Sequence, residues 1–327
     1  MPWSMKEVPF STVLTALEDD ARVFPVKYIG RFSDLSPAHL DSVMQIWPRL
    51  PLARKHSLLK RMVELFDDDT VLSFDALAAR LLDDPDGQVR VDALRLLAET
   101  GDTRLLPRLM QMTASDPEPA CRAAAAALLG QFVEMGELEE MSAGHLKRVT
   151  DCLLLAAADS DSSLARAALE SLGYSSRNEA LALIESAFQR HDPRWQASAL
   201  AAAGRSADAR WQEQVIEAFL SEDQQVRLAA VRDAGELQLK PARQPLLNMI
   251  EDEEDDEVLQ AIIWSLSLIG GEDVREYLQT LIDDTDDDDM LDFLEDALLN
   301  LEFTEDSEDF NLLAVDEDEP VVKKKRP

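Results

Sequence analysis

Leu81 to Asp102 reads LLDDPDGQVRVDALRLLAETGD, an Asp-rich turn followed by an apolar-periodic segment that ends at a glycine. Asp and Ser side chains accept hydrogen bonds from the exposed N–H groups at a helix start, and negative charge is favourable at that end of the helix dipole. We therefore expect Asp83 to Asp86 to form a joint that caps the helix after it and starts a new structural unit.

The same pattern recurs along most of the chain. Its fourteen-residue blocks, aligned on the apolar residue after each acidic turn, begin at Val89, Cys121, Leu164, Trp195, Val226, Val258 and Met290. The starts are 31 or 32 residues apart, except for one step of 43 residues. A period of this regularity is the signature of a repeat array.

Each block has the periodicity of a helix with one buried face. Its first, fifth and ninth positions are apolar in all seven copies, and positions four residues apart lie on one face of a helix. A second apolar-periodic segment follows each block, so one repeat is a first helix, a short turn, a second helix and an acidic turn. The tenth position is mostly Ala, Gly or Ser, which would let neighbouring helices approach closely.

The pattern divides the chain into three parts. Residues 1–51 predict a divergent helical cap, in which Ser36 and Pro37 have the form of an N-cap and a first helical residue. Residues 52–303 predict the repeat array. Residues 304–327 predict a disordered acidic tail with a basic end.

Three further features accompany this division. The 43-residue step contains about eleven extra residues, Val133 to Gly144, which predict an extended loop between helices. The predicted tail contains the apolar island DFNLLAV, which has the form of a segment that docks into a groove. Its terminal KKKRP is interpreted as a solvated basic end, with a nuclear signal as the alternative.

The charge of the chain is strongly negative and unevenly spread. The formal net charge is −33, and the part from Glu251 to the end has 28 acidic and five basic residues, a charge of −23. Such a field repels nucleic-acid phosphates and anionic membranes and attracts basic surfaces. We expect a partner protein with a basic surface, and neither direct nucleic-acid binding nor membrane binding.

The compartment is expected to be the cytoplasm. No N-terminal apolar run has the length of a membrane span, and the start MPWSMKEVPF lacks the regions of a signal peptide. The two cysteines, Cys121 and Cys152, lie in apolar helical patterns and are expected to act as small buried hydrophobes.

The blocks resemble HEAT repeats, specifically the short type named for phycobilisome-lyase-like proteins, over roughly Leu52 to Phe303. The resemblance implies an all-α fold, a right-handed armadillo-like α-solenoid or superhelix of tandem HEAT-like helix pairs. The matching residues are Asp86, Val89, Arg90, Ala93, Leu97, Gly101, Asp102, Val226, Arg227, Gly235, Val258, Leu266, Ile269 and Gly270.

Two enzyme activities occur in proteins of this fold. Deoxyhypusine hydroxylases use His-Glu dipeptides to hold a di-iron centre, whereas His39, His56, His145 and His191 are followed by Leu, Ser, Leu and Asp. Bilin lyases offer no comparably sharp sequence test, so an accessory lyase or chaperone-type protein that acts on a cofactor remains the alternative.

The chain carries no other motif that predicts chemistry. The Asp-rich runs Glu251–Glu257 and Asp283–Asp289 lack the spacing of an EF-hand, which would need a glycine at Asp288 and a glutamate at Leu294. We interpret them as solvated capping turns, with weak divalent-cation binding as the alternative. Phosphate-binding loops, nucleophile elbows and C-x-x-C pairs do not occur. No cofactor, metal or enzymatic activity is expected.

The predicted function is a non-catalytic scaffold or adaptor that binds a protein. We expect the second helices to line the concave side of the solenoid, and arginine and tryptophan are enriched at binding hot spots. Reversing the charges of Arg108, Arg148 and Arg243 together should then weaken binding. The candidate partner-binding residues are Arg104, Arg108, Gln111, Arg148, Trp211, Gln214, Arg243, Gln244, Asn248 and Gln279.

Overall fold

A computed structural model describes residues 8–68, 71–250 and 253–315 of the chain. This described part is helical and contains no strand. It divides within one helix into two compact units, residues 1–180 and 181–327, each of which is considered by itself. None of the described helices combines the length and the hydropathy that a membrane crossing requires.

Unit 1 begins with the predicted helical cap. Ser36 caps α2 by accepting a hydrogen bond from the His39 backbone N–H at 3.3 Å, and Pro37 is the first helical residue, as predicted. The aromatic rings of Phe10, Phe24 and Phe32 form its core, with edge-on contacts at 6.1 Å between ring centroids. The helices of this segment are α1 (Phe10–Glu18) and α2 (Pro37–Ile46), with the short 3-10 helices Val26–Phe32 and Trp47–Arg49.

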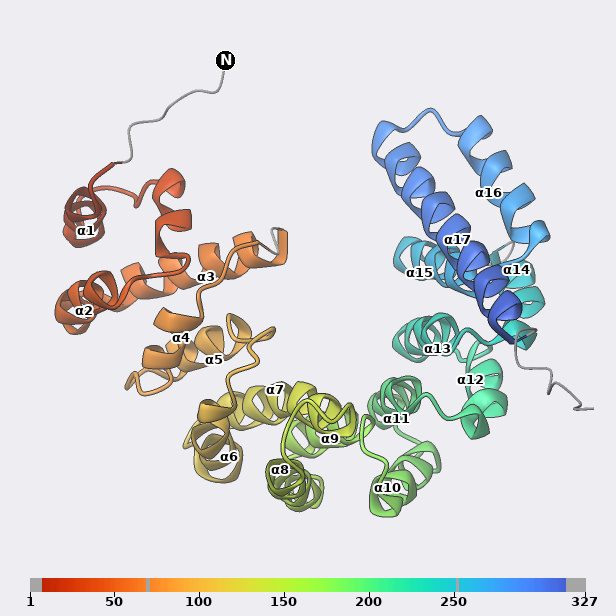
Figure 1. The fold of residues 1–327 in the computed structure, drawn as a ribbon, viewed down its shortest axis with the longest axis horizontal. Coiled ribbons are helices and arrows are strands. Elements are labelled where there is room, and N and C mark those ends of the chain that lie inside the picture. The colour runs from red at the N-terminus through yellow and green to blue at the C-terminus, as the bar shows by residue number, and fades with distance from the viewer. Residues whose placement is uncertain (1–7, 69–70, 251–252, 316–327) are drawn as a thin grey trace, which may run out of the picture. The chain divides into compact units, whose positions relative to one another are not determined.

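The rest of unit 1 consists of antiparallel helix pairs (Figure 1). Its first helices are α3 (Leu52–Asp68), α5 (Gly87–Arg95), α7 (Pro119–Glu137) and α9 (Ser162–Leu172). Their partners are α4 (Asp75–Leu81), α6 (Leu106–Ser115, preceded by the 3-10 turn Thr103–Leu105) and α8 (Ala143–Ala156), and α10 (Asn178–Phe188) contains the boundary between the units.

Unit 2 repeats this arrangement. Its first helices are α11 (Pro193–Ser206), α13 (Gln224–Glu236), α15 (Asp256–Ile269) and α17 (Asp288–Val315). Its second helices are α12 (Gln212–Ala218), α14 (Arg243–Ile250) and α16 (Glu272–Asp284), of which α12 and α14 follow the 3-10 turns Ala209–Trp211 and Lys240–Ala242.

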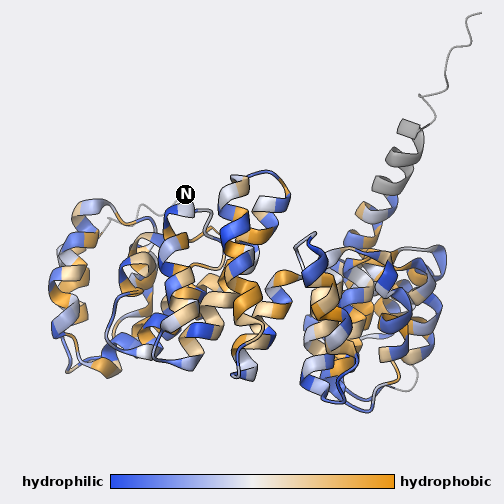
Figure 2. Ribbon diagram, turned by 90° about the horizontal axis from the view of Figure 1, so that it is seen from below, coloured by the Kyte–Doolittle hydropathy of each residue, from blue (hydrophilic) through white to orange (hydrophobic). Residues whose placement is uncertain are grey.

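The predicted buried face of the first helices is confirmed. The fifth position of the block is at most 1% exposed in all seven copies, from Ala93 to Leu294. Hydrophobic residues gather where helices pack on one another, and the turns are hydrophilic (Figure 2). Burial of this apolar stripe supplies the main driving force for each helix pair.

Small residues at the tenth position bring consecutive first helices close together, as predicted. A Cβ atom on Gly130 would lie 2.9 Å from the Ser171 hydroxyl oxygen, and one on Gly235 would lie 2.8 Å from the Ser265 Cβ. The last copy has Leu299 at this position, and its side chain is 63% exposed. Its exposure shows that no described helix covers this position of α17, so a large side chain fits there.

The two rows of helices differ in spacing. Consecutive first helices pack closely, as α7 does on α9 and α13 on α15, whereas consecutive second helices are much less in contact. In a curved stack the more closely spaced row lies on the inner side, so the first helices form the inner row of each unit. The prediction that the second helices line the concave side was therefore wrong.

Two boundaries also differ from the predictions. The extra residues after Val133 mainly lengthen α7, which continues to Glu137, so that only a short turn separates it from α8. The helix α17 continues to Val315, so helix replaces the predicted disorder over residues 304–315, and Thr304 is buried within it. The remainder of the predicted tail, including KKKRP, lies outside the described residues.

Candidate binding surface

The acidic turns act as helix caps, as predicted. The Asp86 side chain accepts a hydrogen bond from the Val89 N–H at 3.0 Å, and equivalent aspartates cap five more of the first helices. The exceptions are α3, which follows Pro51, and α7, which starts at Pro119 and whose preceding residue, Glu118, makes no such bond. These side chains are occupied in structural roles.

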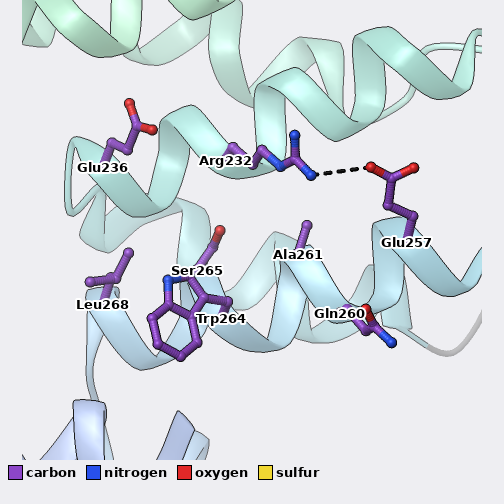
Figure 3. Close-up of a pocket in the computed structure, with 8 residues that line it drawn as sticks. All are labelled: Arg232, Glu236, Glu257, Gln260, Ala261, Trp264, Ser265 and Leu268. Atoms are coloured by element: carbon purple, nitrogen blue, oxygen red, sulfur yellow. Dashed lines mark hydrogen bonds and ion pairs between the residues drawn. The ribbon is translucent and has the colours of Figure 1, made fainter. Parts of the chain in front are cut away.

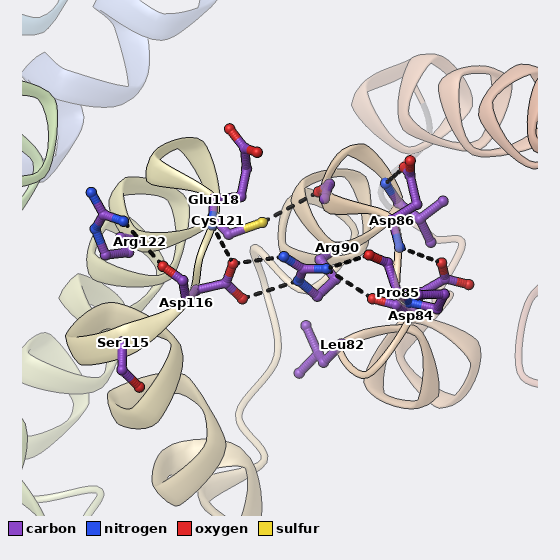
Figure 4. Close-up of polar contacts among 12 residues, drawn as sticks. Leu82, Asp84, Pro85, Asp86, Arg90, Ser115, Asp116, Glu118, Cys121 and Arg122 are labelled. Carbon is purple, nitrogen blue, oxygen red and sulfur yellow. Dashed lines mark hydrogen bonds and ion pairs between the residues drawn. The ribbon is translucent and has the colours of Figure 1, made fainter.

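The turns also bind consecutive repeats together through an arginine (Figure 4). Arg90, the second residue of its block, donates two hydrogen bonds to the Asp116 carboxylate at 2.7 and 3.0 Å and one to the Asp84 carbonyl at 2.9 Å. Arg227 makes the same contacts with Glu253, at 2.8 and 2.9 Å, and with the Ser221 carbonyl. The Val-Arg pair of the repeat is thus a structural joint.

Ionisation supports this joint. The hydrogen bonds and charge of Arg227 hold the pKa of Glu253 below its ordinary value. Burial alone would raise the pKa of Asp116, but its bonds with Arg90 and with the Glu118 N–H outweigh burial and lower it. Both carboxylates are therefore charged at neutral pH and committed to the arginines.

The surroundings of Cys121 disfavour an ionised thiol. Burial raises the pKa of the Cys121 thiol to about 11, and its thiol lies 3.2 Å from the Gly87 carbonyl. Cys121 is buried, as predicted, whereas Cys152 is half-buried. Among the residues with described positions, no group of three or more His, Cys, Asp or Glu side chains could hold a metal ion.

Three of the ten predicted partner-binding residues are tied into the fold. Trp211 is only 5% exposed, and its ring packs on Phe188 at 5.6 Å. Arg108 pairs with Asp83 at 3.0 Å, and Arg243 pairs with Asp273 at 3.3 Å. Trp211 is thus unavailable as a surface anchor, and reversing the charge of either arginine would break an ion pair within the chain as well as any contact with a partner.

The other seven predicted residues are exposed, and among them the Gln244 side chain donates to that of Asn248 at 3.2 Å. They lie on or beside the second helices of both units, in the outer row. Two arginines belong to this exposed set. Arg148 lies in the α-helix α8, whereas Arg104 lies in the 3-10 turn before α6. The exposed residues are Arg104, Gln111, Arg148, Gln214, Gln244, Asn248 and Gln279.

A more concentrated feature lies on the inner row of unit 2. Trp264 of α15 is 41% exposed, and its ring lies 6.5 Å from that of Phe293 on α17. It borders a pocket of about 340 Å³ between α13 and α15, together with Leu268 and the acidic residues Glu236 and Glu257 (Figure 3). Arg232 of α13 crosses the pocket to pair with Glu257 at 3.2 Å.

Trp264 was missed by the sequence analysis, although the repeat contained a signal for it. It occupies the seventh position of its block, which faces away from the buried stripe. The other copies have charged residues or alanine there: Arg95, Ala127, Glu170, Ala201, Arg232 and Asp296. A tryptophan at this position is thus an exception to the pattern of its own repeat.

The sequence of the repeats identifies the family. Residues 74–151 and 212–298, which together make up just over half of the chain, match the HEAT-repeat profile. The chain belongs to the HEAT-repeat family. Its fold is an all-α solenoid of helix pairs, while the short, phycobilisome-lyase-like subtype stays a prediction.

Solved structures with a similar fold include proteins with different descriptions. The Escherichia coli protein YibA is 17% identical, with a TM-score of 0.34, over 73% of this HEAT-repeat chain and 96% of its own. Human deoxyhypusine hydroxylase, in complex with glycerol, is 16% identical, with a TM-score of 0.35, over 80% and 95% of the two chains. Importin beta is 15% identical, with a TM-score of 0.42, over 89% of this chain and 41% of its own.

These likenesses concern the fold and carry no information about activity. No curated protein sequence matches the chain. The function of this HEAT-repeat protein therefore has to be argued from its own surfaces.

Proposed function

We propose that the protein is a non-catalytic scaffold or adaptor that binds another protein through the inner row of unit 2, around Trp264. The observation that carries the proposal is the 41% exposure of this tryptophan on a helix face where the repeat otherwise has charged or small residues. Tryptophan supplies a large contact area at low entropic cost and is enriched at binding hot spots. An adjoining pocket gives a partner side chain a place to enter.

The charge of unit 2 favours a partner with a basic surface. The sequence from Glu251 onward has a formal charge of −23, and Glu236 and Glu257 border the pocket itself. Such a field accelerates association with a basic protein and disfavours nucleic acid and anionic membranes. We place this function in the cytoplasm, where the two free cysteines would stay reduced.

The absence of catalysis is part of the proposal. The repeat-joining arginines and capping aspartates already have structural partners. The four histidines are scattered along the sequence without a His-Glu pair, so a hydroxylase activity has no ligands that favour it. The lyase or chaperone-type role stays the alternative.

Affinity capture with matched variants tests the proposal. The full chain and its Trp264→Ala variant are used as baits in native lysate, and captured proteins are quantified by mass spectrometry. A basic protein that the Trp264→Ala variant captures at least tenfold less supports the inner row. Arg148→Glu is the matched variant on the outer row, and it is expected to leave this capture unchanged. If only the Arg148→Glu variant loses capture of the basic protein, the partner binds the second helices and not the inner row.

A further inference from the structure

The pocket beside Trp264 has two ends that differ in how their charges are paired. Arg232 extends toward Glu257 at one end, where the two side chains pair at 3.2 Å (Figure 3). Glu236 and Leu268 lie at the opposite end, beyond Trp264. The side chains that line the pocket include two glutamates and one arginine, so their formal net charge is −1.

Glu236 is the carboxylate of this pocket that has no cation of its own. Its side chain is exposed and makes no hydrogen bond or ion pair within the part of the chain that the structure describes. Lys240, four residues further on, is not part of the pocket wall and donates to the Ile269 carbonyl. Burial raises the pKa of the neighbouring Asp233, and the charge of Glu236 raises it further. A cation beside Glu236 would therefore meet an unpaired carboxylate that lies close to a second carboxyl group.

The helix that carries Glu236 favours a cation at the same place. Glu236 is the last residue of α13, and the last turn of α13 contains no basic residue. The C-terminal end of a helix carries partial negative charge from the aligned peptide dipoles. The carboxylate and the helix end therefore both attract a positive charge that approaches from solvent.

Trp264 and Leu268 supply the walls at this end of the pocket. The Trp264 side chain is 41% exposed, although its ring contacts that of Phe293 at 6.5 Å between centroids. The face of an indole carries negative potential and attracts cations that lie within about 6 Å of the ring centroid. Leu268 is half-buried and offers apolar surface to the methylene stem of a long side chain.

The size of the pocket indicates a single side chain as its occupant. Its volume of about 340 Å³ is near the lower limit of the range of about 300–1,000 Å³ that is typical of small-ligand sites. Arg232 extends across the middle toward Glu257 and leaves the end at Glu236 for an incoming group. One long cationic side chain fits this end better than a folded element does.

The arrangement of the groups selects arginine over lysine. A guanidinium is planar, so it can lie flat on an indole while its N–H groups donate in the plane to a carboxylate at the edge. The ammonium of lysine is a compact, strongly hydrated point charge and gains less from an aromatic wall. The pocket already accommodates one guanidinium at its other end, where Arg232 pairs with Glu257.

We infer that the Glu236 end of this pocket binds one arginine side chain of the partner protein. The guanidinium lies over the Trp264 indole and donates to the Glu236 carboxylate, and the methylene stem contacts Leu268. This inference rests on the proposed function and deepens it, because it names the partner group that enters the pocket.

A nuclear magnetic resonance titration with defined probes tests the inference. The probe is N-acetylarginine methylamide, and the comparison probes are the corresponding amides of citrulline, which has nearly the same shape without the charge, and of lysine. The full chain carries nitrogen-15 in its indole rings, and the Trp264 signal is assigned from the Trp264→Phe variant. Glu236→Gln is the test variant, and Glu217→Gln, at an exposed position of α12, is the matched control. The Trp195 signal is the internal control, because the Arg190 guanidinium already lies 3.7 Å from that ring centroid.

The arginine amide should shift the Trp264 signal saturably, with a Kd about tenfold lower than that of the citrulline amide, because its charge gains a cation–π contact and a charged hydrogen bond. The lysine amide should bind more weakly than the arginine amide. Glu236→Gln should weaken binding of the arginine amide severalfold, while Glu217→Gln leaves it unchanged and the Trp195 signal stays in place. Circular dichroism should report the same helix content for all variants.

Three results of the titration would overturn the inference. They are equal binding of the arginine and citrulline amides, binding of the lysine amide as tight as that of the arginine amide, and arginine binding that Glu236→Gln does not weaken.

Capture from lysate separates this inference from the function on which it rests. The captured basic protein should be lost with Trp264→Ala and also with Glu236→Gln. Loss with Trp264→Ala alone would overturn the arginine site and leave the proposed function standing. Capture that persists with both variants would contradict the proposed function, and the inference with it.

Discussion

Asp233 of α13 lies so close to Gly204 of α11 that a Cβ atom on the glycine would be 2.6 Å from the carboxylate oxygen Oδ1. The Asp233 side chain is buried, and its other oxygen, Oδ2, has no hydrogen-bond partner among the described residues. The close approach that the glycine allows therefore places an acidic group inside the helix interface.

Asp233 occupies the eighth position of its block, where two other repeats have serine. The Ser171 hydroxyl donates to the Ala126 carbonyl at 2.9 Å, and the Ser265 hydroxyl donates to the Val231 carbonyl at 2.8 Å. In both cases the serine hydroxyl donates its hydrogen bond to a backbone carbonyl of the preceding first helix. A carboxylate cannot do this, because it has no proton to donate when it is ionised.

Replacing Asp233 with asparagine should stabilise unit 2 at neutral pH. Burial raises the pKa of Asp233 well above its ordinary value, and the neighbouring Glu236 raises it further, against the opposing effects of Arg205 and the Gly204 backbone. An unsatisfied buried polar group costs about 1–3 kcal/mol, so the free energy of unfolding of Asp233→Asn should rise by about that amount. Urea unfolding at pH 7 measures the gain.

The pH dependence of this gain has a definite sign. Because the folded-state pKa is raised, the protonated carboxyl is favoured in the folded state, and its contribution to stability is lost as pH rises through that pKa. The advantage of Asp233→Asn should therefore shrink as pH is lowered from 7 toward 4. Asp256→Asn, at an exposed position, is the control. A gain that is constant over this range would show that the charge of Asp233 is not the cause.

Two glycine-to-alanine changes should have opposite effects. Alanine normally stabilises a helix by about 0.5–1 kcal/mol relative to glycine, and Gly144 in α8 has open space around it, so Gly144→Ala should gain this amount. A Cβ atom on Gly235 would meet Ser265 atoms at 2.8 Å, and overpacking costs about 1–3 kcal/mol. Gly235→Ala should therefore destabilise in thermal unfolding. A gain at both positions would refute the close approach of α13 and α15.

The Arg90–Asp116 pair should behave as a coupled unit. Only 7% and 3% of the two side chains are exposed, and removing one partner of a buried pair costs about 3–5 kcal/mol. Arg90→Met or Asp116→Leu alone should therefore be strongly destabilising, and the double variant should be less destabilised than the sum of the two. A double-mutant cycle, with free energies of unfolding measured in urea, gives the coupling energy between the two side chains. If the effects of the two single variants simply add up in the double variant, the residues are not coupled.

The fold could largely be predicted from the sequence because its signals are local and repeated. The acidic cap at Asp86 and the buried fifth position depend on a residue's own helix pair, and the small residues at Gly130 and Gly235 each reflect one neighbour in the next repeat. Seven copies of the block reinforce these signals. The HEAT resemblance stated from Asp86, Val89 and Arg90 is confirmed at the level of the family.

The candidate binding surface was harder to predict because it depends on how one repeat differs from the next and on which row of helices is more closely spaced. The periodicity indicates which face of a helix is buried but not which row of helices is more closely spaced, so the second helices were assigned to the wrong side. The surface role of Trp211 was wrong because the residue ends a short 3-10 turn, and its ring packs against Phe188. Trp264 was detectable only as an exception to its own repeat.

The most direct test of the account is the affinity of the captured basic partner for the purified full chain and for its Trp264→Ala variant, measured by calorimetry at 50 and 300 mM salt. If the inner row of unit 2 recognises the partner, the variant should bind at least tenfold more weakly at both salt concentrations, and both proteins should bind more weakly at the higher salt. Equal affinities of the two proteins would contradict recognition through the inner row of unit 2.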